Sequence, residues 1–219
     1  MSLPFERIAR VALRCADLDA TAQAYSRFFG VREWAVRERE LIPTGAGETQ
    51  RYASAIGHAG PVGFELITPL DDHGVLADAF ATRGPGISHL VVEAADPHAL
   101  AAPARALGVR TQAWSLAEGP VLTLNGQDIP GHLPVWYATD TAPPAPDRVL
   151  RLEHTAVLPV QRLYQVSVIV PDLAAARARY EAVLGIEAWV EFPLESGPGM
   201  PEPQYYGRVV DHSARIAIG

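Results

Sequence analysis

The stretch RVALRCADLDATAQAYSRFFGVREW, residues 10–34, decides the fold because the chain restarts it as QVSVIVPDLAAARARYEAVLGIEAW at residues 165–189. The two copies align without a gap over 25 positions. A third, weaker copy, HLVVEAADPHALAAPARALGV, occupies residues 89–109, and its start lies 79 residues after Arg10 and 76 before Gln165. Three copies at nearly equal spacing indicate an internal repeat, which sets the architecture before any local assignment. The identical pairs of the two strong copies are Val11/Val166, Asp17/Asp172, Leu18/Leu173, Ala20/Ala175, Tyr25/Tyr180, Gly30/Gly185 and Trp34/Trp189.

Each copy has the same order of local features. A short alternating run is followed by an aspartate, a stripe of apolar residues at helical spacing, and a glycine. The aspartates (17, 96, 172) suit helix N-caps and the glycines (30, 108, 185) suit helix ends. Pro103 lies inside the second helical stripe and should bend or shorten that helix. Strand-like segments follow each glycine, at 32–42, 50–57 and 62–68 in the first copy and at 110–116, 120–126 and 133–139 in the second. The unit is therefore βαβββ.

The repeat predicts the domain organisation. Residues 5–140 form one domain of two βαβββ modules, 8–69 and 86–140. Residues 141–160, beginning TAPPAPDRVL, read as a Pro-rich linker and connection. Residues 161–219 form an incomplete third module, because the final ARIAIG (214–219) resembles YASAIG (52–57), the third strand of the first copy. Either the natural chain continues into a fourth module or a partner molecule completes the third, and we favour the former.

Composition narrows the function. The chain has 219 residues, 48 % of them hydrophobic, and a formal charge of −7, which argues against nucleic acid or an anionic membrane as the main partner. We expect a cytoplasmic protein, since there is no apolar run of transmembrane length, no signal-peptide pattern, and one cysteine, Cys15. All 18 basic residues are arginine, which removes lysine chemistry, PLP included. No NAD fingerprint or nucleotide-binding P-loop is present.

Strand alternation selects the residues that face a cavity. In the first strand Val11, Leu13 and Cys15 form an aliphatic face that can pack on a helix. The opposite face repeatedly admits polar groups and should line a cavity. That polar phase contains Arg10 and Arg14 in the first copy, His89 and Glu93 in the second and Gln165 in the third, with Glu65 and Tyr137 in the closing strands.

The chain resembles the vicinal-oxygen-chelate superfamily, the glyoxalase, bleomycin-resistance and extradiol-dioxygenase group. The resemblance is carried by ADLDA…Y…FFGV, PDLAAARARYEAVLGI, FELITP at 64–69 and GPGISHLVVEAAD at 84–96. The middle region is most similar to methylmalonyl-CoA epimerases. This resemblance implies an α+β fold in which tandem βαβββ modules pair into a curved half-barrel, with the third module truncated. It also implies a cup that holds a divalent metal and a small substrate.

In that superfamily the metal ligands come from the first and last strands of each module. Carried over by position, these places hold Arg10, Glu65, His89 and Tyr137. His89 and Glu65 match the pattern, whereas Arg10 stands where His or Gln is expected and Tyr137 where Glu is expected. An arginine cannot ligate a cation, because it is protonated and offers no lone pair. Glu65 and His89 would then form only a weak metal site, and Gln165 would belong to a second, incomplete one.

Three functions follow from the resemblance. The first is an isomerase or lyase that stabilises an enolate or oxyanion of a small oxo or carboxylate substrate, with Glu65, His89 and Arg10 catalytic. Arg10, Arg14, Tyr137 and Glu93 would then contact the substrate. The second is a metal-free, resistance-type binding protein. The third is the supporting half of a longer four-module enzyme. We also expect a homodimer, because an incomplete module leaves a sheet uncovered.

Structural interpretations of the same residues stay open. Glu65 can be an ion-pair partner of Arg10 across the cup, with no metal between them. His89 can be a hydrogen-bonded core histidine, and Tyr137 can be core packing.

Overall fold

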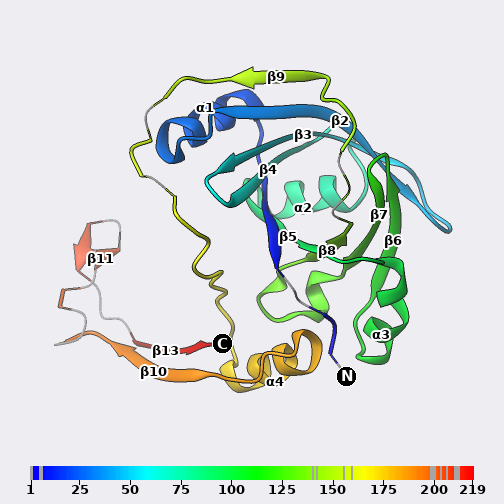
Figure 1. Cartoon of the computed structure of the whole chain (residues 1–219). Coiled ribbons are helices and arrows are strands. Elements are labelled where there is room, and N and C mark those ends of the chain that lie inside the picture. Colours follow the sequence, from blue (N-terminus) through cyan, green and yellow to red (C-terminus); the bar gives the residue numbers. More distant parts are fainter. Residues whose placement is uncertain are drawn as a thin grey trace.

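The computed structural model describes the chain except residues 1, 5, 6, 140, 142, 155, 159, 198–200, 203, 206 and 210–212. Nine strands form one sheet in the order β3-β4-β1-β5-β8-β7-β6-β2-β9, and β2 also pairs with β3, which closes the first eight strands into a barrel (Figure 1). The strands are β1 (Ile8–Arg14), β2 (Glu33–Pro43), β3 (Gln50–Ala59), β4 (Val62–Pro69), β5 (Gly86–Glu93), β6 (Thr111–Leu116), β7 (Gly119–Leu124), β8 (Val135–Ala138) and β9 (Arg148–Arg151).

The two predicted modules pair through their first strands. β1 lies between the parallel β4 of its own module and the antiparallel β5 of the second module. β5 in turn lies beside the parallel β8. On the far side, Ile42 and Pro43 at the end of β2 pair with Ser115 and Trp114 of β6. The α+β fold of paired modules is thereby confirmed, and the ring is closed further than the half-barrel that the sequence predicted.

The helices begin and end where the repeat predicts. At α1 (Leu18–Phe29) the Asp17 side chain accepts the Ala20 N–H at 2.9 Å, and the helix ends at Gly30 with φ 74°, a conformation that favours glycine. α4 (Leu173–Leu184) repeats both caps with Asp172 and Gly185. The other helical segments are α2 (Val75–Arg83), α3 (Ala101–Ala106), η1 (His98–Leu100), η2 (Gly126–Asp128) and η3 (Pro130–His132).

Of the other two α-helices, one agrees with the sequence prediction and one lies outside the repeat. α3 has only six residues and contains Pro103 in its first turns, as the proline predicts. α2 lies between the modules, in a segment to which the repeat assigns no element. No helix in the described part of the chain is long and apolar enough to cross a membrane.

Three apolar clusters hold the fold together. One packs α1 on the outer face of the first module, around the buried Trp34 and Leu66. A second packs the outer face of the second module against α3 and α4, around Leu122 and Tyr137. The third lies inside the barrel and consists of Ala12, Leu41, Tyr52, Ile67, Leu76, Trp114, Val121 and Trp136. The barrel interior is therefore largely filled, as in other small barrels.

The third copy departs from the prediction at its first strand. Residues 165–170 belong to no strand, and Ile169 is 98 % exposed. The alternation of this segment alone does not make a strand, because a strand needs hydrogen-bonding neighbours and no described strand pairs with these residues. The remaining strands form small pairs, β10 (Val190–Glu195) with β13 (Ser213–Ile218) and β11 (Gln204–Tyr205) with β12 (Arg208–Val209).

The rest of the third copy follows the first. In the first module Trp34 of β2 lies opposite Gly57 of β3, and a Cβ at Gly57 would meet the Trp34 ring at 2.8 Å. In the third module a Cβ at Gly219 would meet the Trp189 ring at 3.0 Å. A tryptophan packed over a glycine of the neighbouring strand therefore recurs in both copies. This agreement supports the alignment of residues 214–219 with 52–57.

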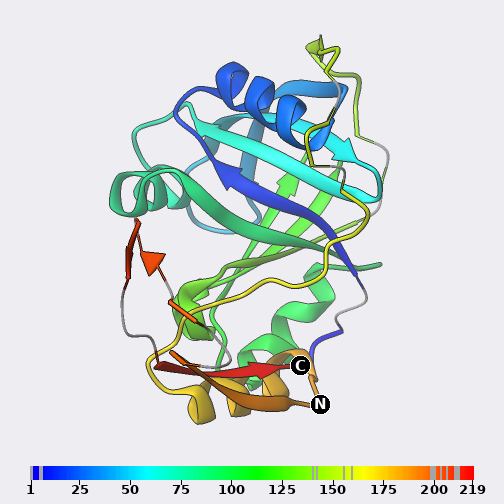
Figure 2. The same cartoon turned by 90° about the vertical axis from the view of Figure 1, so that its left-hand side faces the viewer.

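The third module is attached to the second. Figure 2 shows α1 at one end of the barrel and α4, with the β10/β13 pair, at the opposite end. Arg179 donates to the carbonyl oxygens of Leu107 at 2.5 Å, Gly108 at 3.0 Å and Asp128 at 3.0 Å. Tyr180 donates to the carbonyl of Pro130 at 2.8 Å. These bonds satisfy carbonyls at the end of the short α3 and in the loop before β8.

The segment predicted as a linker also contributes to the barrel. β9 lies within it and pairs antiparallel with β2 from Glu33 to Val36. Arg37 donates from Nε and Nη2 to the carbonyl of Pro144, at 2.9 and 2.6 Å. The Pro-rich stretch is thereby fixed against the outer edge of the first module.

We expect Arg179→Ala to lower the free energy of unfolding by about 2 kcal/mol, because three carbonyl groups lose a charged donor. Urea unfolding followed by circular dichroism measures this, with Arg215→Ala, on the exposed edge of β13, as the matched control. Equal stability of the two variants would show that α4 is attached by apolar packing alone.

Candidate functional site

Strand register decides which side chains enter the barrel. Residues paired across neighbouring strands point to the same side of a sheet. Ala12 lies in the interior cluster and pairs with Glu65 on β4 and with His89 on β5, so both side chains point inward. Arg10 pairs with Val91 and points inward one step nearer the barrel mouth.

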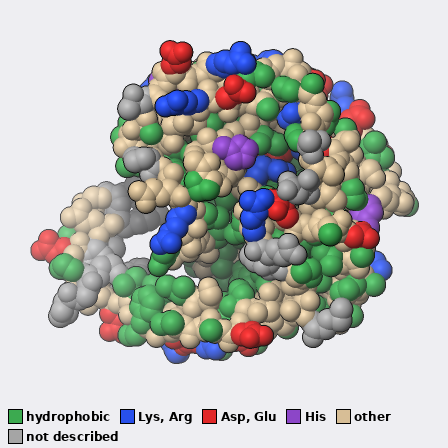
Figure 3. All heavy atoms as spheres, in the orientation of Figure 1, with side chains coloured by type: hydrophobic (Ala, Val, Ile, Leu, Met, Phe, Trp, Pro, Cys, Tyr) green, Lys and Arg blue, Asp and Glu red, His purple; other side chains and the backbone are tan. Residues whose placement is uncertain are grey.

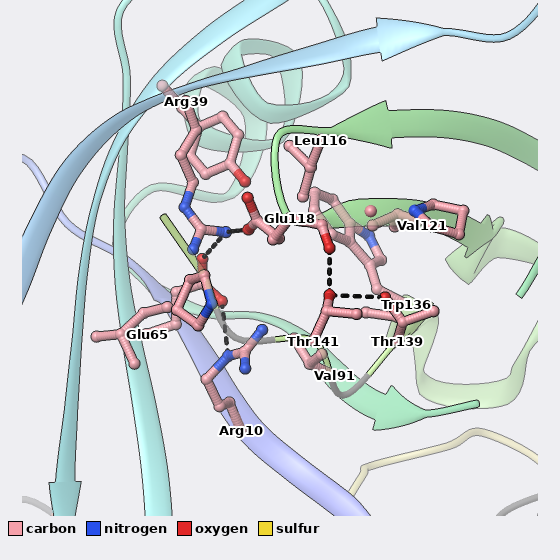
Figure 4. A pocket seen from close by; sticks show the side chains of 16 residues that line it. Arg10, Arg39, Glu65, Val91, Leu116, Glu118, Val121, Trp136, Thr139 and Thr141 are labelled. Carbon is pink, nitrogen blue, oxygen red and sulfur yellow. Dashed lines mark hydrogen bonds and ion pairs between the residues drawn. The ribbon is translucent and has the colours of Figure 1, made fainter. Parts of the chain in front are cut away.

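An ion-pair network occupies this mouth (Figure 4). Glu65 is 3 % exposed, and its Oε2 accepts the Arg10 Nε–H at 3.2 Å. Its Oε1 lies 3.5 Å from Nη1 of Arg39, and the same Nη1 lies 2.5 Å from Oε1 of Glu118. Arg39 comes from β2 and Glu118 from the turn between β6 and β7. Two guanidinium groups and two carboxylates thus balance in charge.

The network keeps its members ionised. Burial alone would raise the pKa of Glu65, but Arg39 and Arg10 together hold it below its ordinary value. Burial alone would lower the pKa of Arg39, but Glu65 and Glu118 raise it. Glu65 is therefore a paired carboxylate at neutral pH, with both oxygens engaged. It is a weak base for abstracting a proton.

His89 lies behind the network and away from the cavity. It is 1 % exposed and stacks on Trp136, with ring centroids 3.7 Å apart and planes at 11°. Its Nδ1 is 3.2 Å from the Ser88 hydroxyl. Burial lowers the pKa of His89 to about 3, so its ring is neutral at pH 7.

The cavity at the mouth has polar walls. It is narrow, with a volume of about 40 Å³, and is lined on one side by Arg10, Arg39, Tyr52 and Glu65. Thr139, Thr141 and Pro143 line the other side. In the described part of the chain, the Tyr52 hydroxyl and the Arg39 Nε–H are buried without a hydrogen-bond partner. Tyr52 lies close enough to Arg39 to raise the pKa of its guanidinium. The two unpartnered atoms do not meet the geometry of a hydrogen bond.

Tyr137 does not reach the cavity, so its predicted inward orientation is wrong. On β8, Trp136 pairs with the inward-facing Val91 and Tyr137 pairs with the outward-facing Val92. Tyr137 is buried in the outer cluster beneath α3 and α4, and burial raises its pKa. The interpretation of Tyr137 as core packing is the one that fits, and Trp136 takes the place opposite Glu65.

Three other predicted residues also lie away from the cavity. Arg14 is buried four positions along β1 from Arg10, about 13 Å away at strand spacing, and donates from Nε to the carbonyl of Gly84 at 2.9 Å. Glu93 pairs with Arg7. Gln165 is exposed and donates to the Ser167 hydroxyl at 3.0 Å. The predicted substrate contacts of Arg14 and Glu93 and the second site at Gln165 find no geometric support.

Sequence reasoning missed Arg39 and Glu118. Arg39 lies on the same face of β2 as the buried Arg37 and Leu41. Strand alternation counted back from the apolar Leu41 would have placed Arg39 inside the barrel. Glu118 lies in a turn and has no such signal. Its position depends on how β2 crosses the β6–β7 hairpin.

The residues at the cup do not fit a divalent metal. Both Glu65 oxygens face guanidinium groups, and a cation would be repelled by Arg10 and Arg39. Trp136 offers no lone pair at the fourth position. Across the described residues, no three His, Cys, Asp or Glu side chains gather as a metal site.

Comparison with known proteins identifies the fold. No family model and no curated protein matches the chain. Among solved structures, a triple mutant of 4-hydroxymandelate synthase from Streptomyces coelicolor matches 89 % of this chain and 57 % of its own, with 17 % identity and a TM-score of 0.59. A hypothetical protein, BH1468 from Bacillus halodurans, matches 62 % of this chain and 95 % of its own, with 14 % identity and a TM-score of 0.51.

Methylmalonyl-CoA epimerase from Mycobacterium tuberculosis matches 65 % of this chain and 91 % of its own, with 23 % identity and a TM-score of 0.47. The matches with 4-hydroxymandelate synthase and BH1468 show that the chain has the vicinal-oxygen-chelate fold. At such identities the likeness concerns the fold and carries no activity with it.

Protonation of His89 gives a pH-dependent stability. Its pKa in the folded protein is about 3, below the ordinary 6.5, so between these values the unfolded chain binds a proton that the folded chain refuses. Protonation of His89 alone should therefore lower the free energy of unfolding by about 2 kcal/mol between pH 7 and pH 5. Urea unfolding at the two pH values should show a smaller loss in His89→Asn. The exposed His154→Asn should behave as the parent, and equal losses in all three proteins would contradict the assignment.

Proposed function

We propose that the cavity at the barrel mouth, called the cup here, binds a small oxo- or carboxylate-bearing molecule without a metal, and that Arg10 anchors this molecule. The observation that carries the proposal is the position of the Arg10 guanidinium, which points into the cavity and contacts Glu65 through Nε (Figure 4). Its two Nη groups, at the far end of the planar guanidinium, can bind a carboxylate in bidentate fashion.

Further support comes from the unpartnered polar atoms of the cavity. A buried hydroxyl or N–H without a partner costs free energy, about 1–3 kcal/mol. The Tyr52 hydroxyl and the Arg39 Nε–H both lie in the cavity wall. An oxygen-rich ligand, or water in its absence, would satisfy them. The cup is thus suited to acceptor groups.

The isomerase or lyase prediction has less support. Enolate chemistry needs a base whose pKa lies near the working pH. Glu65 is paired with two arginines, and His89 lies outside the cavity with a strongly lowered pKa. The barrel supplies oxyanion stabilisation through Arg10, but no poised proton acceptor. Binding without turnover is the function that this geometry supports best.

A second candidate is a supporting barrel of a longer enzyme. One observation favours it: the match to 4-hydroxymandelate synthase takes in 89 % of this chain but only 57 % of that protein. In this case the Arg39 network serves stability alone, and chemistry belongs to a further pair of modules.

Titration calorimetry with pyruvate, an oxo-carboxylate, tests the binding proposal. Arg10→Ala should weaken binding at least about tenfold, since a hydrogen-bonded charge is lost. Arg10→Lys should weaken it less, and Tyr52→Phe should weaken it if the hydroxyl contacts the ligand. Arg151→Ala, exposed on β9, is the matched control, and neutral methylglyoxal tests the need for charge. Unchanged pyruvate binding in Arg10→Ala would reduce Arg10 to a partner of Glu65.

Elemental analysis of the purified protein tests the absence of a metal requirement in the cup. We expect well below one equivalent of Zn, Co, Ni or Mn per chain, because Arg10 and Arg39 repel a cation at Glu65. One equivalent in the parent that disappears in His89→Ala would overturn both this expectation and the proposed function.

A further inference from the structure

A second, larger hollow lies on the outside of the barrel, next to the cup. Its walls are the start of β1 (residues 7–11), the turn into β4 (residues 61–63) and residues 162–163, just before the third copy of the repeat. Its volume is about 360 Å³. We call it the β1 groove. Pockets of this size hold small organic molecules.

Positive charge gathers around the β1 groove. Arg7, Arg10 and Arg162 all line it. Arg7 pairs with Glu93, and Arg10 pairs with Glu65, which Arg39 shares. Arg162 lies over the ring of Tyr164, 5.1 Å from its centroid, and among the described residues it has no carboxylate at ion-pair distance. Arginine keeps its charge when buried or paired, so the unpaired positive charge of Arg162 persists at all ordinary pH values.

Apolar surface lies between these charges. Ile8, Val11, Val62 and Leu163 line the groove; Leu163 is 37 % exposed, whereas Val11 and Val62 are buried. Figure 3 shows a hollow in the middle of this face, with arginine side chains at its rim and hydrophobic side chains in its depth. Exposed apolar surface with a charged rim is typical of a binding site for an amphipathic molecule.

One wall of the groove comes from the third copy of the repeat. Residues 162–163 lie just before that copy, belong to no strand and make this wall. In the first module the corresponding residues lead directly into a paired strand. The feature therefore belongs to the arrangement of this chain rather than to the paired-module barrel.

We propose that the β1 groove binds a small molecule that has an anionic head group, a carboxylate or a phosphate, and an apolar body. The head group lies on Arg162, and the apolar body lies against Leu163. This site is distinct from the cup, since Arg162 and Leu163 do not line the cup. The proposal rests on these groove residues and not on the function proposed for the cup.

Calorimetric titration with octanoate, octyl phosphate and octanol tests the proposal. Octanoate or octyl phosphate should bind at one site, and octanol at least about tenfold more weakly, because it lacks the charge. The stronger of the two anions identifies the head group. Binding should weaken as NaCl is raised. No saturable binding of either anion, or octanol binding as tightly as both, would overturn the proposal.

Variants locate the site. Arg162→Ala should weaken binding of the stronger anion about tenfold, and Arg162→Lys should weaken it less, because it keeps the charge but loses the planar fork. Leu163→Asn should weaken octanoate more than acetate, since only octanoate has an apolar body. Arg215→Ala on β13 is the matched control with an exposed arginine. Circular dichroism verifies folding, and unchanged affinity in the folded Arg162→Ala and Leu163→Asn would refute the assignment.

Discussion

The buried carboxylate of Glu65 is the constraint on which the rest of the structure depends. Removing an ion of this size from water costs several kcal/mol, and only close partners of opposite charge offset that cost. Arg10 from β1 and Arg39 from β2 supply them. Because Arg39 also reaches Glu118 of the second module, one network joins strands from both halves of the barrel.

The same network defines what the cup can do. A carboxylate shared by two guanidinium groups is neither a free metal ligand nor a poised base. What it leaves available is the outer part of Arg10, together with a buried hydroxyl on Tyr52 that lacks a partner. Electrostatic pairing therefore occupies the carboxylate that a metal would need, and the ligand proposed above would meet these remaining polar groups. His89 contributes ring stacking on Trp136.

The third copy of the repeat shows how one sequence pattern serves two roles. α4 keeps the caps of α1, but it also attaches to the second module through Arg179, Tyr180 and Val183. The corresponding face of α1 is exposed at Phe28. The segment before α4 belongs to no strand, and its residues 162–163 line the β1 groove. The third copy therefore both packs against the second module and contributes a wall of this groove.

The sequence by itself determined the repeat, the helix caps, the shortened α3 and the meeting of Arg10 with Glu65, because these depend on local periodicity and on residues at matching strand positions. The inward position of Trp136 in place of Tyr137 follows from the pairing of β8 with β5, and a single step of register exchanges the two faces of a strand. The contact of Arg39 with Glu118 depends on a turn meeting a distant strand. Only the tertiary structure decided these features, since a strand's partners lie outside its own sequence.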